Sequence, residues 1–133
     1  MIRLILAALT AVTLSGPVPA QEGPVQGVIA GQIEAFQRDD FDAAFGFASP
    51  LIQGLFGTPE KFGLMVRRGY PMVWRPADVQ YLDQRVEAPY TYQNIRIRDA
   101  DGAVFNLEYQ MIATPDGWQI NGVQFIEAPG LSA

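Results

Sequence analysis

The sequence of 133 residues contains no cysteine and no histidine. Without cysteine the chain forms no disulfide and has no thiol nucleophile, so its oxidation state offers no means of regulation. Without histidine it has no imidazole base that works near neutral pH and no Ser-His or Cys-His pair. Zinc sites built on these softer ligands are excluded as well. The chemistry that remains is that of carboxylates, tyrosine, lysine and arginine.

Basic residues are also few. The chain has nine Lys and Arg residues against 14 Asp and Glu residues, which gives a formal net charge of −5. The basic residues are scattered along the sequence and form no stripe that could follow a phosphate backbone. Nucleic acids and anionic membranes are therefore not the expected partners.

Long apolar runs are missing except near the N-terminus, where residues 4–14 follow Arg3. A run of about eleven residues is too short for a bilayer, which needs about 20 residues of helix. The run ends at Ser15-Gly16-Pro17, and Val18-Pro19-Ala20 places small residues at the two positions that a signal peptidase recognises. The segment is thus typical of a secretory signal.

We predict that residues 1–20 form a signal peptide that is cleaved between Ala20 and Gln21. A lipid anchor would need a cysteine at that point, and the chain has none. The expected product, residues 21–133, is one periplasmic or secreted domain without stable membrane insertion. Because soluble nucleotide cofactors are scarce outside the cytoplasm, we expect no cofactor.

The first half of the mature chain has helical spacing. Pro24 suits the first turn of a helix whose apolar stripe comprises Val25, Val28, Ile29, Ile33 and Phe36. Gln32 is the one polar residue that falls within this stripe. Two interpretations of Gln32 remain open: a buried amide bonded to loop backbone, or a polar group in a pocket.

Further helices are predicted at three places. Asp39, Asp40 and Asp42 cluster where a second helix begins, and we interpret them as capping residues rather than catalytic acids. Ser49-Pro50 and Thr58-Pro59 repeat one device, a hydroxyl cap followed by proline at the first helical position.

After Tyr70-Pro71 the period changes from helix to strand. Four segments are rich in β-branched and aromatic residues, namely 78–87, 91–98, 103–113 and 118–126, and short turns separate them. The fold class predicted is α+β, in which N-terminal helices pack on one side of a curved, four-stranded antiparallel meander.

The last two strands show which side chains face the helices. Alternation puts Phe105, Leu107, Tyr109 and Met111 on one face of the third strand, and Asn106, Glu108 and Gln110 on the other. In the last strand, a bulge at Asn121-Gly122 would turn Val123 and Phe125 inward.

Three strings stand out in the mature chain: D-D-F-D-A-A-F-x-F-A-S-P from Asp39, T-P-E-K-F-G-L-M-V-R-R-G-Y-P from Thr58 and D-G-W-Q-I-N-G-V from Asp116. They resemble an uncharacterised family of exported bacterial proteins, domain of unknown function 4864, over most of the mature chain. That family resembles the nuclear-transport-factor-2-like, or cystatin-like, superfold, in which a bent sheet and helices enclose a conical pocket. The resemblance implies a fold but no catalytic residues, because the superfold hosts isomerases, cyclases, dehydratases and non-catalytic modules.

If this cone is present, its lining should come from inward strand positions and from the segment that follows the third helix. With Gln32, the ligand-binding candidates are Tyr70, Trp74, Tyr81, Tyr109, Met111 and Trp118. The alternative is that these side chains simply fill the core, since aromatic residues bury large apolar areas.

Three functions follow as hypotheses. The first is a non-catalytic module that binds a small apolar or aromatic ligand or a protein. The second is a cofactor-free isomerase, cyclase or hydro-lyase, in which Asp83 is the inward base and Tyr109 holds the oxyanion; it requires that Asp83 share a face with Tyr81. The third is a structural homodimer or envelope-assembly protein that pairs through the outer sheet face, at Val104 and Ile112, joined by Phe125 if the bulge in the last strand is absent.

Overall fold

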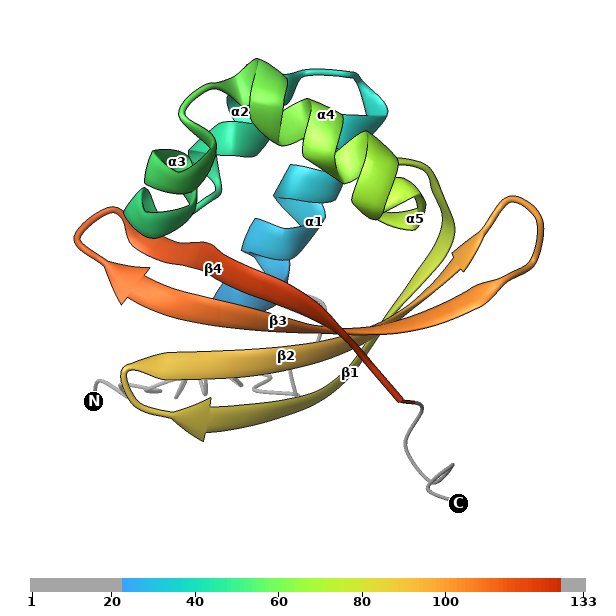
Figure 1. The fold of residues 1–133 in the computed structure, drawn as a ribbon. Coiled ribbons are helices and arrows are strands. Elements are labelled where there is room, and N and C mark those ends of the chain that lie inside the picture. Colours follow the sequence, from blue (N-terminus) through green and yellow to red (C-terminus); the bar gives the residue numbers. More distant parts are fainter. Residues whose placement is uncertain (1–22, 128–133) are drawn as a thin grey trace, which may run out of the picture.

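Five helices precede four strands within residues 23–127, the part of the chain that the computed structural model describes (Figure 1). The helices are α1 (Pro24–Gln37), α2 (Phe41–Gly46), α3 (Pro50–Phe56), α4 (Pro59–Gly69) and α5 (Pro71–Trp74). The strands are β1 (Pro76–Glu87), β2 (Tyr90–Asp99), β3 (Val104–Thr114) and β4 (Gly117–Ile126). The predicted cleavage site between Ala20 and Gln21 lies outside the described residues.

Proline opens four of these helices, α1, α3, α4 and α5, where its restricted φ suits the first turn. Both predicted hydroxyl caps are confirmed. Ser49 Oγ accepts a hydrogen bond from the N–H of Ile52 at 3.4 Å, and Thr58 Oγ1 accepts one from the N–H of Lys61 at 3.2 Å. The prediction missed α5, because four residues are too few to establish a period.

The strands pair antiparallel in the order β1-β2-β3-β4, and the five helices lie against one face of the twisted sheet (Figure 1). The predicted α+β fold is therefore confirmed. Within residues 23–127, no helix combines the length and apolar character needed to cross a membrane.

Two of the three irregularities in the strand register decide which of the predicted site residues face inward. In β4, Ile120 pairs with Met111 and Gly122 with Gln110, so Asn121 is the extra residue of a bulge. The predicted bulge is confirmed, and beyond it Val123 takes an inward position opposite Tyr109.

The second bulge, in β1, was not predicted. Tyr81 pairs with Ile95 and Gln84 with Gln93, so Leu82 and Asp83 lie opposite the single residue Asn94, and β1 has one extra residue here. Alternation is interrupted after Tyr81, and the face of every following β1 side chain depends on this bulge.

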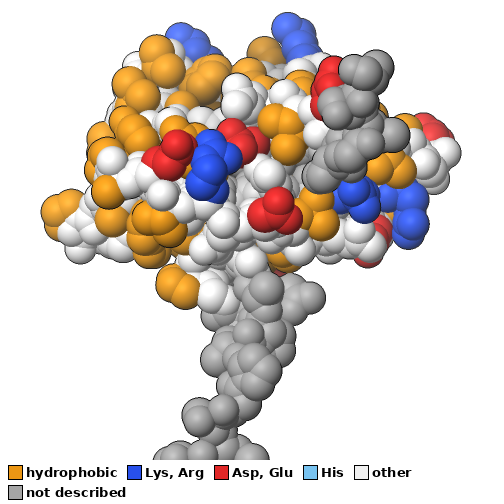
Figure 2. Space-filling view, turned by 90° about the horizontal axis from the view of Figure 1, so that it is seen from below, with side chains coloured by type: hydrophobic (Ala, Val, Ile, Leu, Met, Phe, Trp, Pro, Cys, Tyr) orange, Lys and Arg blue, Asp and Glu red, His pale blue; other side chains and the backbone are white. Residues whose placement is uncertain are grey.

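The outer face of the sheet is polar. The carboxylate of Glu108, although only 9% exposed, accepts hydrogen bonds from Arg85 Nη1 at 3.1 Å and from Gln124 Nε2 at 3.2 Å. On the visible part of this side of the molecule, acidic and basic side chains are interspersed with apolar ones (Figure 2).

Val104 is 55% exposed at one end of β3, whereas Phe125, 51% exposed, lies on the inner side of the sheet because of the β4 bulge. Phe125 therefore does not belong to an outer dimer surface, and pairing through Val104 and Ile112 stays a prediction.

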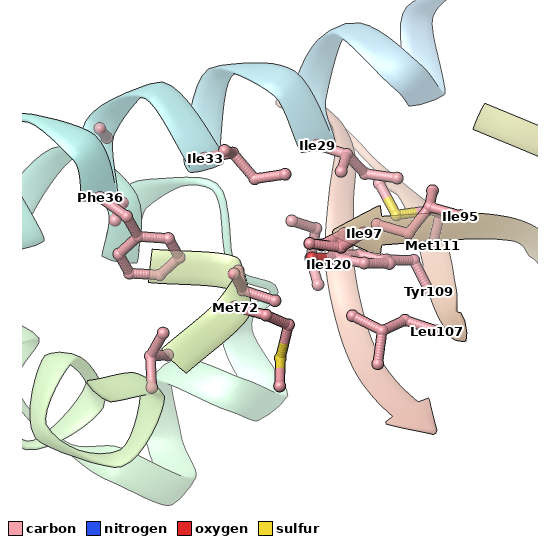
Figure 3. Packing of buried hydrophobic residues seen from close by; sticks show 14 of the residues in the cluster. Ile29, Ile33, Phe36, Met72, Ile95, Ile97, Leu107, Tyr109, Met111 and Ile120 are labelled. Atoms are coloured by element: carbon pink, nitrogen blue, oxygen red, sulfur yellow. The ribbon is translucent and has the colours of Figure 1, made fainter. Parts of the chain in front are cut away.

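The core lies between the helices and the inner face of the sheet. Figure 3 shows Ile29 and Ile33 of α1 pointing toward side chains of the strands, whereas the Phe36 ring lies among the helices, with its centre 5.8 Å from that of Phe62. The inner residues of β3 have the predicted alternation, and Leu107, Tyr109 and Met111 are fully buried. This arrangement places Tyr109 at the centre of the sheet, between β2 and β4.

Candidate ligand-binding cavity

A cavity of about 250 Å³ lies between the helices and the inner face of the sheet. Its lining comes from α1, α3, α4 and α5 on one side and from β3 and β4 on the other. Most lining side chains are apolar, among them Phe36, Ile52, Phe56, Phe62, Val66 and Ile120. Among the described residues, no acidic or basic side chain lines it. Since a cavity of about 150 Å³ holds benzene, this one has room for a molecule of about two fused rings.

Three polar side chains interrupt the apolar lining: Gln32, Tyr70 and Tyr109. Gln32 Nε2 donates a hydrogen bond to the carbonyl oxygen of Ala44 at 3.1 Å, and the Tyr70 hydroxyl donates one to the carbonyl oxygen of Val123 at 3.2 Å. The Tyr109 hydroxyl is buried and has no hydrogen-bond partner within the described structure. Two of the three polar groups are thus engaged by the fold, and the third is not.

Tyr109 is fully buried, and its ring extends from β3 toward the helices (Figure 3). Burial raises the pKa of this phenol far above its usual value, and nearby Tyr81 and Tyr70 raise the pKa further to a smaller extent. The phenol is therefore protonated at every ordinary pH, and its O–H can act as a hydrogen-bond donor.

The two interpretations of Gln32 describe the same side chain. Gln32 is 3% exposed and its amide is bonded to backbone, here the carbonyl of Ala44 in α2. It also lines the cavity. A side chain that satisfies a helix carbonyl can still present the rest of its amide to a ligand.

Trp74 does not line the cavity, contrary to expectation. Its indole Nε1 donates a hydrogen bond to Asp39 Oδ1 at 2.8 Å, and the guanidinium of Arg75 lies 4.2 Å from the centre of its ring. The guanidinium of Arg67 is 5.6 Å from the same ring. These polar contacts hold Trp74 away from the cavity, in a position where it is partly buried against the core.

Three more predicted lining residues lie elsewhere, because different parts of the inner sheet face meet different neighbours. Tyr81 borders a separate hollow beside α1, next to Glu34 and Gln37. Met111 is fully buried in the core. Trp118 is partly buried against that core and is likewise absent from the lining of the cavity.

Asp83 is exposed, and the hypothesis that it is an inward base is wrong. The reason is the β1 bulge, which separates Asp83 from the inward series of Val79 and Tyr81. The backbone carbonyl of Asp83 accepts a hydrogen bond from Gln93 Nε2 at 3.3 Å, so its contact with the interior is through backbone. Tyr109 has no acid–base partner at this position.

The contribution of α3 and α4 to the cavity was not predicted. Ile52, Leu55 and Phe56 of α3 and Met65 of α4 line it, and Leu55 is 69% exposed at its opening. The available signal was the spacing of apolar residues after Ser49-Pro50, which marks an amphipathic turn. That signal does not reveal whether such a turn covers core or borders a cavity.

The acidic cluster before α2 has two roles rather than one. Asp40 caps α2 as predicted, since its Oδ1 accepts a hydrogen bond from the N–H of Ala43 at 3.1 Å. Asp39 instead has a φ of 56° and binds Arg75 Nη2 at 3.0 Å. The hydrogen bond from Trp74, followed by that from Arg75, lowers the pKa of Asp39 below its usual value.

A second hollow, of about 280 Å³, lies on the outer sheet face. Its polar side chains bind one another: Gln124 Nε2 donates to Glu108 Oε1 at 3.2 Å, and Gln110 Nε2 donates to the Tyr92 hydroxyl oxygen at 2.9 Å. Across residues 23–127, no three acidic side chains come together as metal ligands. The apolar cavity with its unpartnered hydroxyl is therefore the stronger candidate site.

A sequence model of a family described as "Domain of unknown function (DUF4864)" matches residues 19–133. No curated protein matches the chain.

Two solved structures are similar to this chain. One is the solution structure of a SEC-C motif containing protein from Rhodopseudomonas palustris, with a TM-score of 0.55 and 12% identity over 77% of this chain and 78% of that chain. The other is the crystal structure of an NTF-2 like protein of unknown function from Burkholderia xenovorans LB400, with a TM-score of 0.47 and 17% identity over 80% of this chain and 88% of that chain. At 12% identity, the likeness to the first structure shows the fold alone.

Proposed function

This chain belongs to the DUF4864 family, a domain of unknown function, and we propose that it is an exported protein that binds a small, largely apolar molecule in its cavity. The observation that carries this proposal is the cavity itself, about 250 Å³ of apolar lining with three polar side chains. Apolar walls with a few placed polar groups are the usual composition of a small-molecule site.

Binding is favoured over catalysis by the composition of the lining. Acid–base catalysis requires a titratable group that can exchange a proton near neutral pH. Among the described residues, no carboxylate, lysine or arginine lines the cavity, and the phenol of Tyr109 is held protonated by burial. Asp83, the candidate base, is exposed on β1.

Access to the cavity supports the same conclusion. Leu55 of α3 lines the cavity and is 69% exposed, and Leu51 of the same helix is 58% exposed. Exposed apolar side chains beside an apolar cavity provide a surface over which an apolar molecule can enter.

Export is the second part of the proposal. It is supported by residues 1–20, whose composition is that of a secretory signal, and by the family match, which begins at residue 19 beside the proposed cleavage site. The test is the intact mass of protein recovered from the periplasm of an expressing bacterium. A mature chain that begins at Gln21 is expected, and an uncleaved, cytoplasmic product would contradict export.

Binding is tested with tetralin, an uncharged hydrocarbon of two fused rings, by thermal shift and calorimetry on the mature protein. Tetralin should raise the melting temperature, because a ligand that binds only the folded state stabilises it. Met65→Trp should abolish the shift, because Met65 lines the cavity and an indole there fills it.

The matched control is Leu64→Trp. Leu64 is the neighbouring residue of α4, is 44% exposed and is absent from the lining. This variant should bind tetralin as the wild type does. No binding by the wild-type protein, together with recovery of the protein free of any small molecule in native mass spectrometry, would overturn the proposal.

A further inference from the structure

The Tyr109 hydroxyl is the one polar group of the cavity lining that the described fold leaves unsatisfied. Gln32 is bound to the carbonyl of Ala44 and Tyr70 to the carbonyl of Val123. The Tyr109 hydroxyl is buried, has no partner, and belongs to a side chain that lines the cavity. A buried hydroxyl without a partner destabilises the folded state, so such groups usually have a specific reason.

We propose that the bound molecule is an uncharged carbonyl compound, and that the Tyr109 hydroxyl donates a hydrogen bond to its carbonyl oxygen. This inference rests on the proposed function, because it names the class of ligand that the same cavity takes. The hydroxyl is itself buried, so the carbonyl oxygen reaches it only when the side chains that cover it move aside. The ligand would then supply the partner that the fold does not, while the apolar lining would enclose the rest of the molecule.

The charge of the lining selects against ionised ligands. No arginine or lysine lines the described cavity to pair with a carboxylate, and no aspartate or glutamate lines it to pair with an ammonium group. An ion moved into an apolar cavity without a partner loses its hydration without compensation. Fatty acids and other carboxylates are thus expected to bind poorly, although they have apolar bodies.

The protonation of Tyr109 makes it a donor. Burial keeps the proton on the phenol, as the raised pKa indicates. A protonated phenol is a strong donor to a carbonyl oxygen and cannot attract a cation by its charge. The hydrogen bond should therefore persist at every pH at which the protein stays folded.

The size of the cavity limits the ligand to about two fused rings or an aliphatic molecule of similar volume. About 250 Å³ exceeds the roughly 150 Å³ that accommodates benzene. A series of matched bicyclic compounds therefore tests the inference: tetralin, the ketone 1-tetralone and the anion tetralin-1-carboxylate.

Dissociation constants for the three compounds are measured by calorimetry with the mature protein, Tyr109→Phe and Tyr92→Phe. The wild type should bind 1-tetralone about tenfold tighter than tetralin, the effect of one net hydrogen bond, and should not bind the carboxylate measurably. Tyr109→Phe should remove the preference for the ketone and keep the affinity for tetralin. Tyr92→Phe, which alters a tyrosine of the outer face, should behave as the wild type.

The carbonyl stretching frequency of bound 1-tetralone gives a second measurement that does not depend on a variant. Infrared spectroscopy of the wild-type complex should show a shift to lower frequency relative to the ketone in an alkane solvent. If Tyr109→Phe fails to fold, this shift alone decides the inference.

The outcomes separate the two proposals. Equal affinity for tetralin and 1-tetralone, or an unshifted carbonyl frequency, overturns the hydrogen bond to Tyr109 and leaves apolar binding intact. Tighter binding of the carboxylate than of the ketone overturns the ligand class. Binding of none of the compounds by the wild type overturns the proposed function, and this inference fails with it.

Discussion

The ring of Tyr70 lies parallel to the ring of Phe125, with their centres 5.1 Å apart and an angle of 6° between their planes. Tyr70 precedes α5 and Phe125 lies in β4, so this pair joins the helices to the sheet. The Tyr70 hydroxyl adds a hydrogen bond to the carbonyl of Val123. Because Tyr70 and Val123 also line the cavity, the stacked pair holds one of its walls in place.

Phe125→Ala should lower the free energy of unfolding by about 1 to 2 kcal/mol, since it removes the aromatic pair and part of a buried ring. It should also weaken the binding of tetralin, because the wall formed by Tyr70 loses its support. Urea denaturation and calorimetry measure the two effects. As a control, Leu64→Ala, which removes an exposed side chain of α4, should change the free energy of unfolding by less than about 0.5 kcal/mol. Equal effects of the two variants would contradict a structural role for the stack.

Asp39 should make stability depend on pH in the acidic range. The hydrogen bonds from Trp74 and Arg75 lower the pKa of Asp39 in the folded state. Its stabilising contribution is therefore complete above the unfolded-state pKa, about 3.9, and is lost as the pH falls through the lower folded-state value. Asp39→Asn should have a lower melting temperature than the wild type at pH 5 to 7, and this difference should shrink below about pH 4.

The backbone does not confound this comparison, because asparagine tolerates the φ of 56° at position 39 as aspartate does. Asp101→Asn is the control, since Asp101 is an exposed turn residue outside the ion pairs of the described chain. A difference between the wild type and Asp39→Asn that grows as the pH is lowered would contradict the assignment.

Gln93 should be far more important for stability than Gln26, although both are buried glutamines. Gln93 Nε2 donates to the carbonyls of Leu82 and Asp83 in the β1 bulge at 3.1 and 3.3 Å, and its Oε1 accepts from Gln26 and Gln84. Gln93→Leu leaves these groups without their partner and should lower the free energy of unfolding by about 2 to 4 kcal/mol.

Gln26→Leu should lower the free energy of unfolding by less than about 1 kcal/mol. Gln26 Oε1 has no partner to lose, and Gln93 keeps its other hydrogen bonds. Chemical denaturation of both variants tests the pair. Equal losses would show that the bulge does not depend on the side chain of Gln93.

Gly63→Ala should destabilise the protein by about 1 to 3 kcal/mol, the usual cost of overpacking. A Cβ atom at Gly63 of α4 would lie 2.5 Å from Cδ1 of Phe41, so the ring would have to move. Gly27→Ala is the matched helical control, because nothing lies within 4 Å of a Cβ there, and it should stabilise α1 by about 0.5 to 1 kcal/mol. Melting temperatures that move in the same direction for both variants would contradict this packing.

The parts of the fold predicted correctly are those that depend on neighbours in the sequence. The caps at Ser49 and Thr58, the alternation of β3 and the bulge at Asn121 are confirmed. Each is determined within a few residues, by a hydroxyl before proline, by a period of two, or by an Asn-Gly pair in a strand.

The parts that were missed depend on residues far apart in the sequence. Trp74 was expected in the cavity, but its indole donates a hydrogen bond to Asp39, which is 35 positions away in the sequence. The residues around Trp74 in the sequence do not indicate this distant partner. The hypothesis of an inward Asp83 depended on unbroken alternation after Tyr81. No local pattern in β1 indicates the bulge there, whose carbonyls accept hydrogen bonds from Gln93 on the neighbouring strand.

The sequence by itself determined the class of this protein: an α+β chain without thiol or imidazole chemistry, with helices first and an antiparallel meander after them. Only the tertiary structure decided which aromatic residues fill the core and which line a cavity, and that Tyr109 is left with an unpartnered hydroxyl. The physical reason is that periodicity assigns a side chain to a face, whereas a cavity and an unsatisfied donor result from how two faces fit together.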